Sequence, residues 1–224
     1  MDKNFISAIK ILNENKIDYW ICHGTLLGIY RDNKLIEWDN DIDIAIFDNN
    51  STKNTIKEYF EKNRFKKKKK YFYDDGLITY EREGGKDIDI NLYKISHVNK
   101  SLIFVNWYLP KNFFFKFIDL ISHASSYYGK YKILTSKLWF LESIFLKIKN
   151  FLIQKNLFFK KIGYEHPYNF ILKRKKINFN NLNILAPNDP AKYLEYIYGK
   201  DWRIPKKNFI WHKDSPAVSE KNEI

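Results

Sequence analysis

The sequence predicts an α+β domain in which helices flank a β-sheet, extended by a basic, aromatic-rich helical region. Apolar residues recur at helical spacing near the N-terminus, and two acidic segments alternate polar and apolar residues with the period of a strand. Lysine then interleaves with aromatic residues through the second half of the chain. With 224 residues the chain can bury a full core, and we expect a core in residues 1–95 and a helical C-terminal region in residues 96–224 packed on it.

Helices and strands alternate in the first third of the chain. A short apolar run reads as a buried strand that ends at His23 and Gly24, and a tight turn then leads into a helix. The turn residues Asp74, Asp75 and Gly76 favour a hairpin. The expected elements are a helix over residues 4–13, a strand over 18–22, a turn and helix over 24–30 capped by Thr25, a helix capped by Ser51 or Thr52 that runs to 63, and strands over 65–73 and 77–82.

A longer helix is expected over residues 135–159, where apolar residues recur every three or four positions. Residues 111–176 hold 14 Lys or Arg against 3 acids, in a chain whose formal net charge is +13. Such a surface suits anions, which include phospholipid head groups, nucleic acid and phosphorylated substrates. A helical core with a lysine-rich solvent face explains the same pattern, so the sequence leaves open whether this helix is ordinary core or lies on an anionic membrane.

Cysteine usage and hydropathy restrict the cellular setting. Cys22 is the only cysteine, so the chain can form neither an internal disulfide nor a cysteine-rich zinc cluster. Lysines interrupt every apolar run before it reaches the roughly 20 residues of a membrane span, and the N-terminal segment lacks the apolar core of a secretory signal. We therefore expect a cytoplasmic protein, with peripheral contact at the inner face of the membrane left open.

An acidic strand is the most informative segment of the chain. Asp39, Asp41 and Asp43 share one face of an extended segment, while the isoleucines that alternate with them share the other. Neighbouring carboxylates on one face lie roughly 6.5 to 7 Å apart, and the segment carries no basic residue to neutralise them. The arrangement suits a divalent cation, although a solvated edge strand or an acidic turn gives the same pattern.

A second segment repeats this alternation with Asp87, Asp89 and Asn91, which face away from the apolar residues between them. If the two strands are neighbours, an acid of the second completes the ligand set begun by the first, and hard oxygen ligands select Mg²⁺ or Mn²⁺ over zinc. The turn at Gly24 and Thr25 offers backbone N–H groups to a phosphate. Together these elements meet the needs of phosphoryl-type transfer assisted by two cations about 3.5 to 4 Å apart.

Residues 23–31 (HGTLLGIYR) and 38–44 (WDNDIDI) resemble the signature of the LicD and fukutin-related family, a branch of the Pol β-like nucleotidyltransferase fold. The resemblance implies a mixed β-sheet flanked by helices. It also implies transfer of phosphocholine or an alditol phosphate from a CDP-activated donor to a sugar of a cell-surface glycan. Residues 100–175 resemble no part of the family. The further similar segments are residues 89–92, 186–190, 193–194 and 198–205.

The resemblance also implies roles for individual acids. Asp41 and Asp43 resemble the paired metal ligands of the family. Asp89 resembles its third acid, which helps to hold the metal or takes the acceptor proton as a general base. Asp39 is either a further ligand or an acid that orients one.

For the donor, the resemblance implies that Gly24 and Thr25 contact the phosphates and that Arg31 contacts the diphosphate, because a planar guanidinium suits that geometry. An exposed ion pair of Arg31 with Asp32 or Glu37 is the alternative. The remaining residues are expected to have other roles: His23 is structural, Asp87 is solvated, and residues 198–205 close a helix at Gly199 and pack through Trp202.

These expectations describe a magnesium-dependent phosphotransferase that uses a CDP-linked donor and a glycan or lipid-linked glycan acceptor. Two alternatives remain. A nucleotidyltransferase would move a nucleoside monophosphate onto a small-molecule hydroxyl, and a non-catalytic domain would bind membrane or nucleic acid through its charge. Nucleic acid is the less favoured partner, because the co-facial acids would repel a polyanion.

Overall fold

The computed structural model describes residues 1–68, 76–96, 102–125, 131–155, 157 and 159–220. The chain forms two compact units. Unit 1 comprises Met1–Lys68, Gly76–Val105 and Tyr164–Ser219, and unit 2 consists mainly of Asn106–Gly163. The expected division into residues 1–95 and 96–224 therefore differs from the compact units, because the chain returns to unit 1 at Tyr164 and packs its last helices there.

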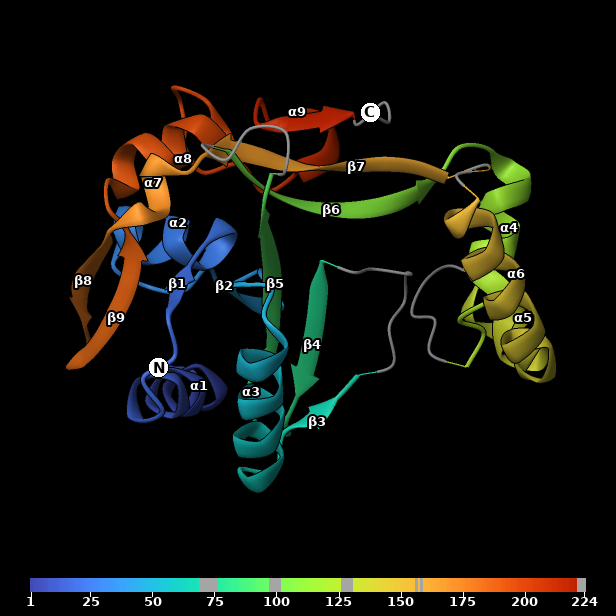
Figure 1. Ribbon diagram of the computed structural model, residues 1–224, viewed down its shortest axis with the longest axis horizontal. Helices are drawn as coiled ribbons and strands as arrows, with labels where there is room; N and C mark the ends of the chain where they lie inside the picture. The colour runs from blue at the N-terminus through green and yellow to red at the C-terminus, as the bar shows by residue number, and fades with distance from the viewer. Residues whose placement is uncertain (69–75, 97–101, 126–130, 156, 158, 221–224) are drawn as a thin grey trace. The chain divides into compact units, whose positions relative to one another are not determined.

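A mixed sheet forms the centre of unit 1 (Figure 1). Strand β2 pairs with β1 in antiparallel and with β5 in parallel orientation, and β5 pairs on its other edge with β4, antiparallel. Strand β3 pairs with β4 in turn, as expected of a hairpin, although residues 74 and 75 of the expected turn lie outside the described residues. The strands are β1 (Tyr19–Ile21), β2 (Asp41–Phe47), β3 (Lys66–Lys67), β4 (Leu77–Glu81) and β5 (Asp87–Ile95). The expected mixed α+β fold is confirmed.

The apolar face of this sheet carries the core of unit 1. Ile42, Ile44 and Ile46 are fully buried, as the period-two alternation predicts. Tyr80 of β4, which is in register with Ile88, brings this face against Phe60 with 4.9 Å between ring centroids. The helices that contribute are α1 (Lys3–Glu14) and α3 (Asn50–Lys62), which contact each other. The opposite face of the sheet is therefore left to the acids.

Two helix caps decide where the flanking helices begin. Asp2 caps α1 by accepting the N–H groups of Asn4 and Phe5, both at 2.9 Å, and this helix confirms the expectation for residues 4–13. Asn49 caps α3 by accepting the Ser51 N–H at 2.8 Å. The expectation that Ser51 or Thr52 caps this helix is wrong, because Asn49 supplies an equally suitable side-chain oxygen two residues earlier.

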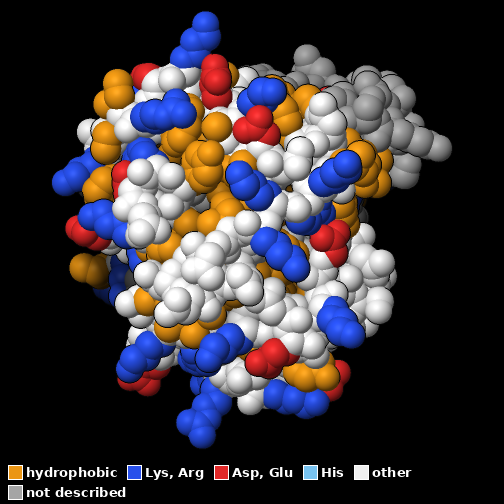
Figure 2. All heavy atoms as spheres, turned by 90° about the vertical axis from the view of Figure 1, so that its left-hand side faces the viewer, with side chains coloured by type: hydrophobic (Ala, Val, Ile, Leu, Met, Phe, Trp, Pro, Cys, Tyr) orange, Lys and Arg blue, Asp and Glu red, His pale blue; other side chains and the backbone are white. Residues whose placement is uncertain are grey.

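Helix α2 (His23–Asp32) contacts β2 and α8. A two-stranded sheet, β8 paired with β9, packs beside β1. Figure 2 shows one face of the molecule, on which lysines and arginines are scattered among apolar and acidic side chains and do not form one stripe. The elements from residue 169 onward are α7 (Asn169–Leu172), β8 (Arg174–Phe179), β9 (Leu182–Pro187), α8 (Pro190–Tyr198), α9 (Trp211–Asp214) and β10 (Val218–Glu220).

Unit 2 is largely helical, and the chain enters and leaves it along strands β6 (Leu102–Pro110) and β7 (Phe159–Pro167). Helices α4 and α6 bury Phe115, Ile118 and Ile153 between them. No helix of the described residues is both long enough and apolar enough to cross a bilayer. The helical segments are α4 (Phe113–Ile121), α5 (Lys132–Lys137), the 3₁₀ turn η1 (Trp139–Leu141) and α6 (Glu142–Gln154).

The expectation of one continuous helix over residues 135–159 is wrong. The helix breaks at Leu138, whose φ of −100° and ψ of 14° leave the α-helical region. The hydroxyls of Thr135 and Ser136 donate to carbonyls three residues earlier, at 3.1 and 3.0 Å, a local alternative to continued α-helix. Helix α6 then ends at Gln154, so the apolar periodicity spans two helices and the turn between them.

Candidate functional site

The turn between β1 and α2 brings the start of the helix against the acidic strand. His23 adopts a left-handed φ of 43°, which is rare for a residue with a side chain, and the chain changes from strand to helix there. The N–H of Cys22 donates to the Asp43 carbonyl at 3.2 Å, and the N–H of Asp43 donates to Thr25 Oγ1 at 2.8 Å. The expected cap role of Thr25 is therefore wrong, because its hydroxyl holds β2 and Cys22 occupies the cap position without a side-chain bond.

Parallel pairing of β2 with β5 brings the two acidic segments together. Asp41 is in register with Asp87, and Asp43 with Asp89. Because side chains alternate along both strands, all four carboxylates project from the same face of the sheet. The sequence-based expectation that the strands are neighbours is met, and residues 41, 43 and 89 share a face.

Neighbouring side chains fix the orientation of the acids. Thr79 Oγ1 donates to Asp89 Oδ1 at 2.6 Å, and Asn91 Nδ2 donates to Asp43 Oδ1 at 3.4 Å. Asp87, which was expected to be solvated, instead pairs with Lys68 at 2.5 Å. Each strand of the acid face therefore has a polar partner on an adjacent element.

The backbone before β2 is held by a lysine from the loop before β5. Lys86 Nζ donates to the carbonyl of Ile36 at 2.9 Å and also to the carbonyl of Asp39. This pair of bonds fixes the loop that carries Asp39 next to the start of the acidic strand. The Lys86 ammonium contacts backbone carbonyl oxygens here, so it does not pair with the Asp39 carboxylate in these bonds.

Burial dominates the electrostatics of the acid face. It raises the pKa of Asp41 to about 7, with a hydrogen bond to Asp39 and the charge of Asp39 as further causes. Burial likewise raises the pKa of Asp89 to about 7 and the pKa of Asp43 well above its usual range. Among the described residues, no lysine, arginine or histidine forms an ion pair with Asp41, Asp43 or Asp89. Asp41, Asp43 and Asp89 therefore lie together without an ion pair of their own among the described residues, and Lys68, the lysine whose charge acts on Asp89, pairs with Asp87.

The donor set fits a hard divalent cation. Its atoms are carboxylate oxygens, the ligands that Mg²⁺ and Mn²⁺ prefer. The raised pKa values of Asp41 and Asp89 show that their negative charge is unfavourable where they lie, and a bound cation would neutralise that charge. As the side chains stand, no three His, Cys, Asp or Glu residues in the described part of the chain form a group that could hold an ion. A cation would have to draw the carboxylates of Asp41, Asp43 and Asp89, with Asp39 beside them, closer together.

Glycine at position 24 makes room for two of these carboxylates. A Cβ atom built there would lie 2.3 Å from Asp39 Oδ2 and 3.7 Å from Asp43 Oδ2. At Gly28, one turn further along α2, a Cβ atom would instead meet the Lys34 carbonyl oxygen at 2.6 Å. The first contact is with the end of a side chain that can rotate, whereas the second is with backbone.

We expect Gly24→Ala to stay folded but to lower activity by roughly 10- to 100-fold, because the added methyl displaces the Asp39 carboxylate. Gly28→Ala should instead destabilise the protein by roughly 1–3 kcal/mol, because the backbone of the following loop must move. Thermal unfolding and turnover of both variants separate the two effects. A Gly24→Ala enzyme with unchanged turnover would contradict a role for Asp39 at the site.

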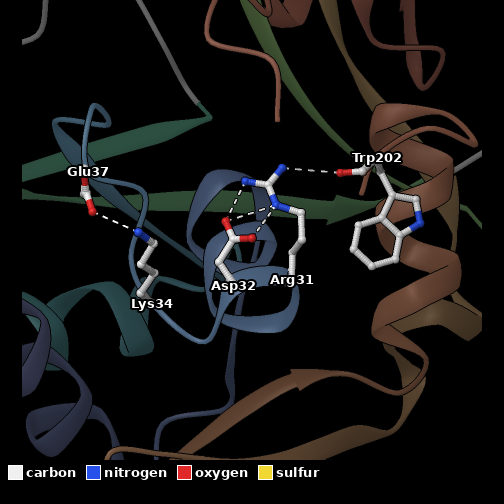
Figure 3. A network of polar contacts seen from close by, with 5 residues as sticks. All are labelled: Arg31, Asp32, Lys34, Glu37 and Trp202. Carbon is white, nitrogen blue, oxygen red and sulfur yellow. Dashed lines mark hydrogen bonds and ion pairs between the residues drawn. The ribbon is translucent and has the colours of Figure 1, made fainter. Parts of the chain in front are cut away.

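Arg31 belongs to a polar network at the C-terminal end of α2 (Figure 3). Its guanidinium binds Asp32 through two nitrogens, at 2.7 to 3.0 Å, and Nη1 donates to the Trp202 carbonyl at 3.4 Å. Lys34 pairs with Glu37 at 2.9 Å. The alternative of an Arg31–Asp32 pair is thus met, although the Arg31 side chain is only 7% exposed and so is not a surface cation.

An open pocket lies beside this network in unit 1, with about 360 Å³ of space that includes open solvent. Leu27 and Arg31 line it from α2, one and two turns after Gly24, and Trp38 lines it from the loop that leads to Asp39. The pocket therefore adjoins the acid face along the helix and along the chain. Its other lining residues are Ile36, Tyr198, Trp202, Ile204, Lys206 and Phe209.

His23 and the segment after α8 have the structural roles expected of them. His23 is buried, its Nε2 lies 3.4 Å from the Tyr93 hydroxyl, and burial lowers its pKa to about 4. Gly199 ends α8 with a left-handed φ of 86°, and Trp202 is buried behind it. Trp202 also lines the pocket and meets Arg31, so this segment helps to shape the candidate site.

Three residues that orient the acids were missed by sequence reasoning. Asn91 was placed on the acidic face by its period-two position, but its bond to Asp43 requires the parallel pairing. Thr79 and Lys86 carried no signal of their own, because their bonds to Asp89 and to the loop before β2 depend on strand register. A hydroxyl or a lysine at such positions is common on any strand.

The segment that forms the acid face is similar to a known family of nucleotidyltransferase domains. Residues 16–124 match the family described as "LicD/FKTN/FKRP, nucleotidyltransferase domain". The match covers just under half of the chain.

Two curated relatives are the ribitol-5-phosphate transferases FKTN of Homo sapiens and Macaca fascicularis. Each is 22% identical over 211 residues, which cover 94% of this chain and 35% of the relative, so the chain spans about a third of their length.

Two solved structures show similarity at low sequence identity. The lincosamide antibiotic adenylyltransferase LnuA, with lincomycin bound, has a TM-score of 0.44 and 11% identity, covering 84% of this chain and 80% of that one. The antibiotic-resistance factor ANT(2'')-Ia has a TM-score of 0.35 and 12% identity, covering 70% and 94%.

Proposed function

We propose that this chain is a metal-dependent phosphotransferase. It moves a phospho-substituent, phosphocholine-like or an alditol phosphate, from a CDP-activated donor to a hydroxyl of a cell-surface glycan, and CMP is released. The observation that carries the proposal is the register of β2 with β5, which brings Asp41, Asp43 and Asp89 to one face of the sheet. Similarity to the LicD/FKTN/FKRP family and to ribitol-5-phosphate transferases supports transfer of a phosphate-bearing group.

The acids divide the work at the reacting phosphorus. Asp41 and Asp43, with Asp39 beside them, would hold Mg²⁺ or Mn²⁺, which when bound neutralises phosphate charge and polarises the bond that breaks. Asp89 is oriented by Thr79 through Oδ1, and its Oδ2 takes the proton of the acceptor hydroxyl. Its pKa of about 7 suits a general base near neutral pH. The acceptor oxygen then bonds to phosphorus as the bond to CMP breaks.

The donor lies along α2 in this proposal. The N-terminus of this ten-residue helix, at Gly24 and Thr25, presents backbone N–H groups and the positive end of the helix dipole to the phosphates. The pocket further along the helix has aromatic walls that stack on a nucleobase. Arg31 and Lys206 also line it, each paired with an aspartate. We place the reaction at the cytoplasmic face of the membrane, where lipid-linked glycans are assembled.

The test is a panel of CDP-linked and UDP-linked donors, incubated with the protein, Mn²⁺ and candidate glycan acceptors. We expect CMP release that requires both the cation and an acceptor, with the phospho-substituent recovered on the glycan. A nucleoside label that ends on the acceptor would instead establish nucleotidyl transfer. Absence of cation-dependent turnover across the panel would count against the proposal.

A further inference from the structure

The outer surface of unit 2 is unusually apolar. Twelve of the 19 large apolar side chains that are exposed on the described residues lie between residues 113 and 157, which make up about a fifth of the chain. Single exposed apolar residues are normal on a soluble protein, but a concentration of this kind marks an interaction surface. These twelve residues, the apolar surface of unit 2, are Phe113, Phe114, Phe117, Tyr131, Ile133, Leu134, Trp139, Phe140, Ile144, Ile148, Phe151 and Leu157.

This surface is separate from the core of unit 2. Helix α6 buries Ile153 against α4, yet Ile144, Ile148 and Phe151 recur at i, i+4 and i+7 on its exposed side. Helix α4 likewise buries Phe115 and Ile118, while Phe113 is 85% exposed. A surface helix ordinarily presents polar residues on the side away from the core, so apolar residues on both sides point to a second apolar environment.

Between residues 111 and 157, the exposed charged side chains that the structure describes are all lysines. The only acids between residues 111 and 157 are Asp119 and Glu142. Asp119 is buried in an ion pair with Lys149, and Glu142 accepts the Ser125 N–H at 2.8 Å. The exposed charged residues of this stretch are Lys111, Lys116, Lys132, Lys137, Lys147 and Lys155.

The buried ion pair also fixes the geometry of the two helices. Lys149 of α6 reaches Asp119 of α4 and lies 3.3 Å from His123 Nε2. Because these groups satisfy one another inside, they anchor α4 to α6. The exposed side of the described helices therefore combines apolar side chains with lysines.

We propose that the apolar surface of unit 2 docks on a bilayer interface that contains anionic lipid. Aromatic and aliphatic side chains bury at the boundary between head groups and acyl chains, while the surrounding lysines meet lipid phosphates. A second copy of the chain would oppose lysine to lysine, and nucleic acid would leave residues such as Ile133 and Leu134 in water. The inference goes beyond the transferase proposal and does not depend on it.

Flotation of the full chain with vesicles tests the proposal. Partitioning onto phosphatidylcholine vesicles that contain phosphatidylglycerol should exceed that onto phosphatidylcholine alone by roughly tenfold or more, and salt should weaken it. The double variant Ile133→Ser, Leu134→Ser should lower partitioning by roughly tenfold, because two exposed aliphatic side chains no longer bury. The matched control Leu172→Ser, Ile210→Ser removes one exposed leucine and one exposed isoleucine from unit 1 and should bind as the parent does.

A charge variant provides a second test in case the Ile133→Ser, Leu134→Ser variant does not fold. Lys132→Gln, Lys137→Gln keeps the apolar residues and should weaken binding to anionic vesicles only. Equal binding to both kinds of vesicle, or equal loss in the unit 1 control, would overturn the proposal. So would self-association that Ile133→Ser, Leu134→Ser abolishes while vesicle binding persists, because a second copy would then be the occupant.

Discussion

Replacing Asp43 by asparagine is expected to lower acceptor-dependent CMP release by roughly 10³-fold, because one removed charge contact at the reacting centre costs about that much. Asparagine keeps the shape of the side chain, and the Asp43 N–H bond to Thr25 Oγ1 survives the change. The fold should therefore be retained, with turnover lost. Turnover with saturating donor and Mn²⁺, beside a circular dichroism spectrum, measures both quantities.

The matched control is Asp18→Asn, at an exposed aspartate that pairs with Arg174 at 3.0 Å. It removes the same charge and an ion pair at an exposed position, where such pairs contribute little. We expect turnover within about twofold of the parent and nearly unchanged stability. If Asp43→Asn were to keep turnover close to that of this control, the assignment of the acid face as the reacting centre would be wrong.

Without a divalent cation, the stability that Asp41 and Asp89 contribute to the folded protein should fall as the pH rises from about 4 to about 7. The pKa values of Asp41 and Asp89 are about 7 in the folded chain against an ordinary value of 3.8, so in this range the folded state binds more protons than the unfolded state. The stability that these protons confer is complete below the unfolded pKa and is lost as the pH passes the folded pKa. Mg²⁺ or Mn²⁺ should restore stability above pH 7, because the cation takes the place of the protons.

Thermal unfolding at about pH 5 and about pH 8, each with and without Mg²⁺, tests this expectation. The melting temperature should rise on addition of the cation at the higher pH and change little at the lower one. Asp43→Asn should raise the cation-free melting temperature at the higher pH, by roughly 2–4 °C for each kcal/mol of relieved repulsion, and should reduce the response to Mg²⁺. The same response to Mg²⁺ in parent and variant would contradict cation binding at this face.

Local alternation was enough to predict the acid face. The period-two pattern at Asp41 and Asp43 and at Asp89 sorts acids from isoleucines within each strand, whatever the partner strand is. That the two strands are neighbours was only a condition of the metal site at that point, and the structure meets it. The partners of the acids could not be predicted this way, because Thr79 reaches Asp89 only through the antiparallel register of β4 with β5.

Helix boundaries were harder to predict from the sequence for a different physical reason. Asn49, Ser51 and Thr52 all have side chains that can cap a helix, and in the folded chain Asn49 is the cap of α3. In unit 2, Leu138 continues the apolar periodicity although the backbone there leaves the helix, because hydroxyl bonds from the preceding residues compete with helix continuation. The return of residues 164–219 to unit 1 depends on contacts between distant segments, which no local pattern carries.

The parallel register of β2 and β5 positions both the acid face and the apolar core of unit 1. An insertion or deletion that shifts this register would therefore damage activity and folding together. If β5 slipped by a single position against β2, Asp89 would turn into the isoleucine core and Ile88 would take its place opposite the acids of β2. Such a chain would lose a reacting group and gain a buried charge at once. The loop before β5, which Lys86 anchors to the Ile36 carbonyl, is therefore expected to tolerate changes of sequence much better than changes of length.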